Sequence, residues 1–186
     1  MNRTRAFLGI ALPEATRRWL YQHYRAHPGS KGQRAIRPEN YHITLVFLGN
    51  CTGDQLASLS HTLVAGQPPF TLRLSTIGPF PGTPARLLAA LFEPCDGIGN
   101  LVDELTRSLE PLGFRPEERR FHPHVTLGKN RRPSAMEAIP LDLEDDQGQF
   151  EVNSFALYKS ELTPGGSIYT PLKIFPLPPR SPGRSQ

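Results

Sequence analysis

The chain has 186 residues, of which 38% are hydrophobic and 20% charged, as is ordinary for a soluble globular protein of one large domain or two packed lobes. No apolar run approaches the roughly 20 residues of a membrane helix, and the run near the N-terminus is too short for a signal peptide. We therefore expect a cytoplasmic protein with no membrane association. The net charge is +4 and Arg outnumbers Lys 17 to 4, which suits an anionic ligand but supports nucleic acid only weakly by itself. Cys51 and Cys95 match no zinc or redox spacing, so we expect free thiols.

The N-terminal part of the sequence predicts alternating strands and helices. A predicted strand over residues 5–12 ends at Pro13, and Pro13-Glu14 is typical of a helix start, so a helix is expected to about residue 26. A loop rich in Gly and Pro follows. The next predicted elements are a short strand over 35–37, a strand over 41–48, a helix over 54–64 and a half-buried strand over 70–77.

The C-terminal part predicts one more helix among strands. A strand over 85–92 precedes a helix over 97–112, in which apolar residues recur every three or four positions. The rest predicts a strand over 121–127, an exposed polar loop over 130–147, two closing strands over 150–162 and 167–177, and a disordered tail over 178–186. This layout predicts an α+β fold of two related halves.

A His-x-Thr-Leu tetrapeptide occurs twice, at 42–45 and at 124–127, and the copies are 82 residues apart. Each lies in an apolar run that favours a strand. Because strand side chains alternate between faces, His42 and Thr44 point the same way, and so do His124 and Thr126. Ile43 and Val125, which lie between these residues, point to the opposite face and can be buried in a core. Each strand thus offers an imidazole and a hydroxyl side by side, and each half of the chain contains one such strand.

Two imidazoles that titrate near neutral pH suit proton transfer at phosphorus. One takes a proton from the attacking oxygen while the other gives a proton to the leaving oxygen. The threonine hydroxyls can donate to the non-bridging phosphoryl oxygens, where negative charge develops. Neither step needs a metal or another cofactor, and the best-fitting substrate is a phosphodiester with an alkoxide leaving group.

Paired His-x-Thr-hydrophobic motifs define the 2H phosphoesterases, which this chain resembles over almost its whole length. Within them it is similar to the RNA 2′,3′-cyclic phosphodiesterases, also called 2′-5′ RNA ligases. The resemblance rests on the segments at 7–13, 40–49, 121–127 and 169–172. It implies a bilobal 2H phosphoesterase fold in a single domain over residues 1–177, with two pseudo-symmetric lobes and the active-site cleft between them.

The resemblance also implies hydrolysis of a terminal 2′,3′-cyclic phosphate on RNA or a nucleotide to a 2′-phosphate. His42 would be the proton donor, His124 the proton acceptor, and Thr44 and Thr126 the phosphate ligands. Lys129 stands where the family usually has Arg, and with Tyr169 it completes the implied substrate-binding set. The expected partners are RNA ends, and the protein is expected to act as a monomer without metal.

Other interpretations remain open at this stage. His122 and His124 form a His-x-His that could bind a metal together with His42 and an acid. Both motifs could be purely structural, or the domain could bind RNA ends without turnover. Joining of 2′-5′ RNA ends is the reverse reaction at the same site.

Overall fold

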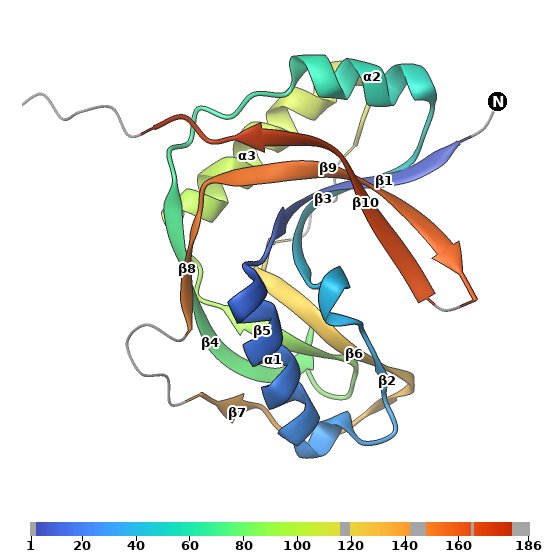
Figure 1. The fold of residues 1–186 in the computed structure, drawn as a ribbon, viewed down its shortest axis with the longest axis vertical. Helices are drawn as coiled ribbons and strands as arrows, with labels where there is room; N and C mark the ends of the chain where they lie inside the picture. Colours follow the sequence, from blue (N-terminus) through green and yellow to red (C-terminus); the bar gives the residue numbers. More distant parts are fainter. Residues whose placement is uncertain (1–2, 116–119, 142–147, 165, 180–186) are drawn as a thin grey trace, which may run out of the picture.

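Two antiparallel sheets form the protein, and each contains one of the two His-x-Thr strands (Figure 1). The computed structural model describes residues 3–115, 120–141, 148–164 and 166–179. The four-stranded sheet has the order β10-β9-β1-β3, with β1 at Thr4–Ala11, β3 at His42–Cys51, β9 at Ser154–Thr163 and β10 at Gly166–Pro176. The six-stranded sheet has the order β2-β6-β5-β4-β7, with β8 paired to β4 off this path. Its strands are β2 (Arg34–Ala35), β4 (Phe70–Phe80), β5 (Ala85–Phe92), β6 (His124–Ser134), β7 (Ile139–Pro140) and β8 (Gln149–Val152).

Three α-helices cover the sheets. They are α1 (Glu14–Ala26), α2 (Gly53–Thr62) and α3 (Asp96–Leu109), and short 3₁₀ turns lie at Pro28–Ser30, Pro38–Asn40 and Glu110–Leu112. α1 follows β1 of the four-stranded sheet but packs on β6 of the other sheet, whereas α3 packs on β3 and β4. Figure 1 shows α2 and α3 beside the four-stranded sheet and α1 beside the six-stranded one. No helix in the described part of the chain is long and apolar enough to cross a membrane.

One hydrophobic core joins the two sheets. Its buried side chains include Leu8 and Ile43 of the four-stranded sheet and Val125 and Leu127 of the six-stranded one, in a single contiguous cluster. The sheets therefore share a core. This supports the proposal of one bilobal domain over residues 1–177.

A β-bulge follows the threonine of each motif. Along β1, Gly9 pairs with Thr44 but Leu8 pairs with Val46, so Leu45 is the extra residue. Along β5, Ala89 pairs with Thr126 but Leu88 pairs with Gly128, which makes Leu127 extra.

A bulge shifts the alternation of side chains by one. Leu127 and Gly128 are consequently both buried, and Lys129 is turned to the exposed face that carries His124 and Thr126. Phe47 is the corresponding exposed residue after the first bulge.

The predicted α+β class is confirmed, but two element predictions and the predicted division into halves are wrong. The predicted loop over 130–147 is wrong at its start, because β6 continues to Ser134, and β7 lies within it. The predicted strand over 150–162 is two strands that meet at Asn153. The first, β8, pairs with β4 of the six-stranded sheet, and the second, β9, pairs with β1 of the four-stranded sheet. The sheets do not correspond to halves of the sequence, since β9 and β10 join β1 and β3. Residues 142–147 of the predicted loop and 180–186 of the predicted tail lie outside the described residues.

The packing of α1 on the second bulge predicts a severe effect of Gly128→Ala. A Cβ on Gly128 would lie 2.6 Å from the Tyr24 hydroxyl of α1 and would also meet Gln33. Overpacking of this kind should lower the free energy of unfolding by about 1–3 kcal/mol in urea titrations. The matched control is Gly99→Ala, in an open position on α3, which should raise the free energy of unfolding by up to about 1 kcal/mol. Equal effects of the two changes would contradict this account of α1 packing.

Candidate active site

His42 lies at the start of β3 and is held by two hydrogen bonds. Its Nδ1 is 2.7 Å from the backbone oxygen of Asn40, and its Nε2 is 3.0 Å from the Thr44 hydroxyl. A carbonyl oxygen only accepts, so Nδ1 carries the proton that is donated to Asn40. In the neutral ring Nε2 is then the acceptor, and Thr44 donates to it.

His124 repeats the arrangement at the start of β6. Its Nδ1 is 2.8 Å from the backbone oxygen of His122, again two residues earlier in the chain. Pro123 lies between them and fixes its own φ angle, which restricts this turn of backbone. Both imidazoles therefore hold the same tautomer and direct Nε2 away from the preceding backbone.

Aromatic rings pack against both imidazoles. The ring of Phe7 lies 4.7 Å from that of His42, and Tyr169 approaches His42 edge-on at 4.8 Å. The ring of Phe80 stacks on His124 at 3.9 Å. Tyr158 stacks in turn on Phe7 at 5.1 Å. Among these rings only Tyr169 was predicted to belong to the site, because a hydrophobic pattern does not tell which aromatic residue of a strand meets a given histidine.

The pKa of both imidazoles is lowered. Burial is the main cause of the fall in the pKa of His42 to about 4, and the nearby charges of His124 and Lys129 add to it. The hydrogen bond to Asn40 acts in the opposite direction. The pKa of His124 is lowered mainly by burial and also by the charge of the His122 ring, whereas the hydrogen bond to the His122 backbone raises it. β3 and β6 contact each other, and the charges of His124 and Lys129 on β6 act on His42 of β3, so the two motifs lie close together.

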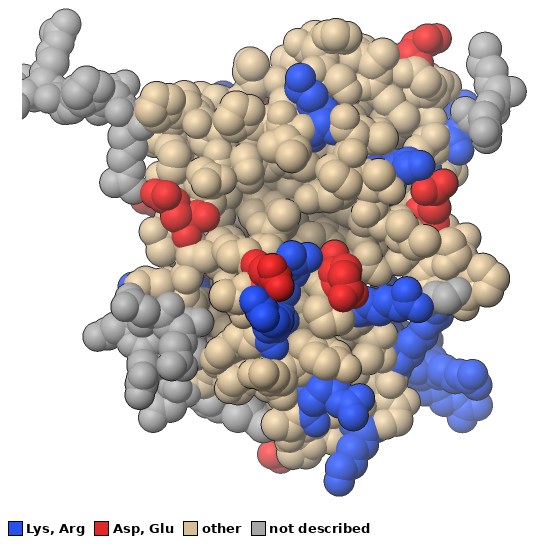
Figure 2. Space-filling view, in the orientation of Figure 1, with Lys and Arg blue, Asp and Glu red and all other residues tan. Residues whose placement is uncertain are grey.

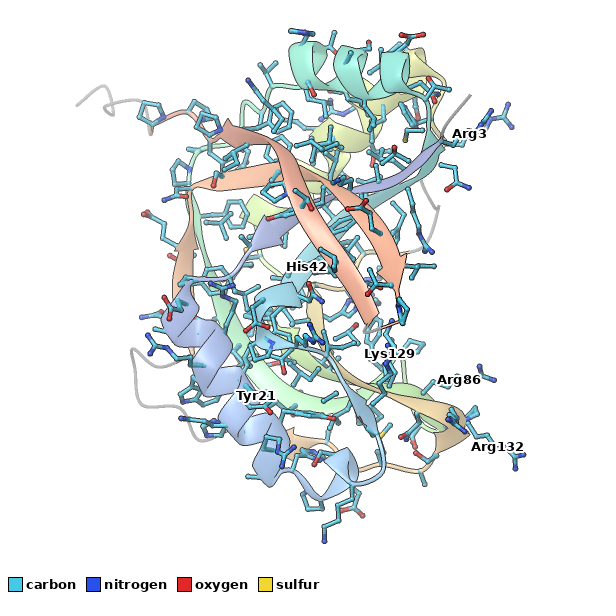
Figure 3. All side chains as sticks on the ribbon, turned by 45° about the vertical axis from the view of Figure 1, so that its right-hand side comes forward. Arg3, Tyr21, His42, Arg86, Lys129 and Arg132 are labelled. Atoms are coloured by element: carbon cyan, nitrogen blue, oxygen red, sulfur yellow. The ribbon has the colours of Figure 1, made fainter. Side chains whose placement is uncertain are left out.

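The structure brings the residues predicted for the site to this space from two sheets. Thr44 contacts His42, Tyr169 packs against it from β10, and Thr126 is half-buried beside His124 on the same face of β6. Figure 3 shows His42 between the sheets and Lys129 on the strand β6 below it. Figure 2 shows that this face of the molecule is hollowed at its centre, between the two lobes.

The His-x-His alternative needs at least one further ligand. His122 supplies its backbone oxygen to His124, and its side chain is exposed. Within the described ranges, no three His, Cys, Asp or Glu side chains lie together as metal ligands. The metal-site interpretation thus lacks a ligand set among these residues.

Comparison with known proteins supplies relatives that match over most of the chain. The model of the 2′-5′ RNA ligase superfamily matches residues 12–164. RNA 2′,3′-cyclic phosphodiesterases of Escherichia coli and Archaeoglobus fulgidus are 33% and 31% identical to the chain. Each alignment spans 177 residues, with 93% of this chain and 96% of the E. coli protein, and 92% of this chain and 99% of the A. fulgidus protein.

Solved structures are also similar to the chain over most of its length. E. coli LigT in complex with 3′-AMP superposes with a TM-score of 0.79 at 28% identity, over 94% of this chain and 98% of LigT. TT0787 of Thermus thermophilus superposes with a TM-score of 0.79 at 30% identity, over 95% of this chain and 100% of TT0787. The similarity covers both lobes, so it extends well beyond the two tetrapeptides.

The lowered pKa of His42 predicts a loss of stability in acid. The folded protein favours the neutral ring, so stability is complete above the unfolded value of about 6.5 and falls as the pH drops toward about 4. The shift corresponds to roughly 3 kcal/mol of unfolding free energy over that window. His42→Asn should flatten this dependence in denaturant titrations at several pH values. The same change at His61, exposed on α2, should leave the slope as it is. An unchanged slope in His42→Asn would contradict the burial of a neutral imidazole there.

Proposed function

The chain belongs to the 2′-5′ RNA ligase superfamily, and from this we propose that it hydrolyses 2′,3′-cyclic phosphates on RNA ends or nucleotides to 2′-phosphomonoesters. The observation that carries the proposal is the matched pair of imidazoles. His42 and His124 hold the same tautomer through equivalent backbone bonds and share one space between two sheets. An acid and a base on opposite sides of one phosphorus need this arrangement. The relatives that bear the name RNA 2′,3′-cyclic phosphodiesterase support the same reaction.

His124 serves as the base in this proposal. Its lowered pKa leaves Nε2 unprotonated near neutral pH, free to take a proton from an attacking water. The water oxygen forms a bond to phosphorus while the bond from phosphorus to the 3′ oxygen breaks. His42 gives its Nε2 proton to that 3′ oxygen, so the products are a 3′ hydroxyl and a 2′-phosphate.

His42 must first gain a proton, because its pKa of about 4 leaves it neutral in the unliganded protein. A phosphodiester carries one negative charge, and an opposite charge within a few ångströms raises the pKa of an imidazole. We infer that substrate binding protonates His42. The acid is then formed only when there is a phosphate to act on.

Thr44 changes its role with that proton. While His42 is neutral, the Thr44 hydroxyl donates to Nε2. Once Nε2 is protonated it no longer accepts, and the Thr44 hydroxyl can donate to a phosphoryl oxygen instead. Thr126 would donate to the phosphate from the other strand, and the Lys129 ammonium would neutralise its charge. Tyr169 would contact the substrate beside His42.

We further propose that the protein works as a monomer in the cytoplasm and without a metal. Both motifs come from one chain, which makes the proposed site complete in a single copy. Cys51 and Cys95 are both free, as suits a reducing compartment. Joining of 2′-5′ ends would be the reverse reaction of the same groups.

Substitutions in the pair test the proposed reaction directly. The substrate is 2′,3′-cyclic AMP in excess chelator, with the products identified. His42→Ala and His124→Ala should each lower kcat by about 10²–10⁴, the usual worth of a positioned acid or base. The double variant should lose less than the product of the two, because both act in one step. Thr44→Ala and Thr126→Ala should lose less than either histidine variant.

His122→Ala is the matched control, because it removes an imidazole two residues away and keeps the carbonyl that orients His124. It should stay close to the wild-type rate. Damage equal to that of His124→Ala, or a loss of wild-type activity in chelator that zinc restores, would favour the metal interpretation. Binding without turnover by the wild-type protein would identify a non-catalytic module.

Protonation on binding can be measured apart from turnover. Titration of the protein with 2′-AMP near pH 6.5, in buffers of different ionisation enthalpy, should show net proton uptake that His42→Ala abolishes.

The leaving group separates the role of the acid from that of the base. A p-nitrophenyl phosphodiester, whose leaving group needs no proton, should be turned over by His42→Ala but not by His124→Ala. The reverse pattern would exchange the acid and the base.

A further inference from the structure

Five exposed cations lie at one end of the six-stranded sheet, and we call them the basic strip. They come from β2, from the start of β5 and from the end of β6, and they are Arg34, Arg86, Lys129, Arg131 and Arg132. Figure 3 places Arg86, Lys129 and Arg132 together on one side of the lower lobe. Figure 2 shows basic side chains gathered at the lower right edge of the molecule, with an acidic side chain between them and the central hollow.

Like charges face each other within the strip, which we expect to lower the free energy of unfolding. Arg34 and Lys129 are directly paired residues of β2 and β6, so their side chains lie opposite each other on one face. Like charges in this position are destabilising. Within the described part of the chain, no member of the strip forms an ion pair with a carboxylate. The second bulge adds to the cost, because it turns Lys129 onto this face.

The strip begins at the candidate site. Lys129 lies on the face of β6 that carries His124 and Thr126, so the inner end of the strip shares that face with the candidate site. The Arg34 guanidinium extends toward the hairpin of the other sheet, where a Cβ on Gly166 would lie 3.2 Å from it. Arg34 thus stands at the mouth between the lobes, and Arg86, Arg131 and Arg132 continue outward along β5 and β6. A chain that leaves the site on this side meets cations at once.

We propose that the basic strip binds the backbone phosphates of the nucleotides immediately 5′ of the cyclic phosphate. This rests on the proposed function: with the cyclic 3′ end between the histidines, all other phosphates of the RNA lie on its 5′ side. Arginines recognise phosphates through two parallel N–H bonds, independently of the base. The strip would make the protein prefer RNA ends to free cyclic nucleotides, which carry no such phosphates.

Binding and salt dependence test the strip without relying on turnover. The probe is a labelled five-nucleotide RNA that ends in a 2′-phosphate, with 2′-AMP as the ligand that lacks 5′ phosphates. Three outer members are neutralised in R86Q/R131Q/R132Q. The matched control is R3Q/R73Q/R107Q, which removes three exposed arginines on β4, on α3 and before β1.

At about 50 mM salt, the ratio of the affinity for the RNA to the affinity for 2′-AMP should be roughly 10-fold lower in the strip variant than in the wild-type protein. The slope of log Kd against log salt should fall by about 2, because each single-strand phosphate contact contributes about 0.7. The control variant should keep the wild-type slope. Arg34→Gln should raise the midpoint of thermal unfolding, since it relieves the repulsion with Lys129.

Other outcomes overturn the inference. Equal salt slopes in the strip and control variants would show that these arginines only solvate the surface. Binding of anionic phospholipid vesicles, lost in the strip variant while RNA binding is kept, would assign the strip to a membrane. Parallel turnover assays separate the two proposals. If the protein hydrolyses the substrates but the strip and control variants have equal salt slopes, only the role of the strip is refuted. If the strip variant has a lowered salt slope but the protein hydrolyses neither cyclic AMP nor cyclic-ended RNA, only the proposed function is refuted.

Discussion

The hydrogen bond from each imidazole Nδ1 to the carbonyl two residues earlier is the constraint on which the rest of the site depends. It decides which nitrogen carries the proton, and therefore which nitrogen is presented to the space between the sheets. A rotated ring would lose the bond from Nδ1 to its carbonyl, and the other tautomer would place an unprotonated Nδ1 against that carbonyl oxygen. The bond is local, so each strand supplies it without help from the other. The sheets then bring together two strands in which each histidine is already oriented.

The paired bulges make the two halves of the site similar in geometry and different in chemistry. The extra residue follows the threonine in both strands, and the next exposed position is Phe47 in β3 and Lys129 in β6. An exact repeat would have placed like groups at both positions. An aromatic ring on one side and a cation on the other give the cleft a direction, which a polar, asymmetric substrate such as an RNA end can follow.

Much of this was visible in the sequence. Period-two alternation placed His42 with Thr44 and His124 with Thr126, the Pro13-Glu14 start signal found α1, and apolar periodicity found α3, because these patterns are local. The position of Lys129 beside the site depends on a bulge that alternation cannot reveal. Phe80 and Arg34 approach from other strands, and pairing between strands leaves no trace in one sequence. The break at Asn153 was missed for the same reason, since both sides of it are apolar strands that differ only in their partners.

The interleaved order of the sheets has a consequence for how the protein is made. β1, the first strand to be synthesised, lies between β3 and β9, and β9 begins only at Ser154. Until that segment leaves the ribosome, one edge of β1 stays open and Phe7 lacks Tyr158, the ring that stacks on it. Both histidines have been translated by residue 124, yet His42 lacks Tyr169 until β10 is complete. A nascent chain therefore carries both histidines of the proposed site before it has the strands that complete the packing around His42.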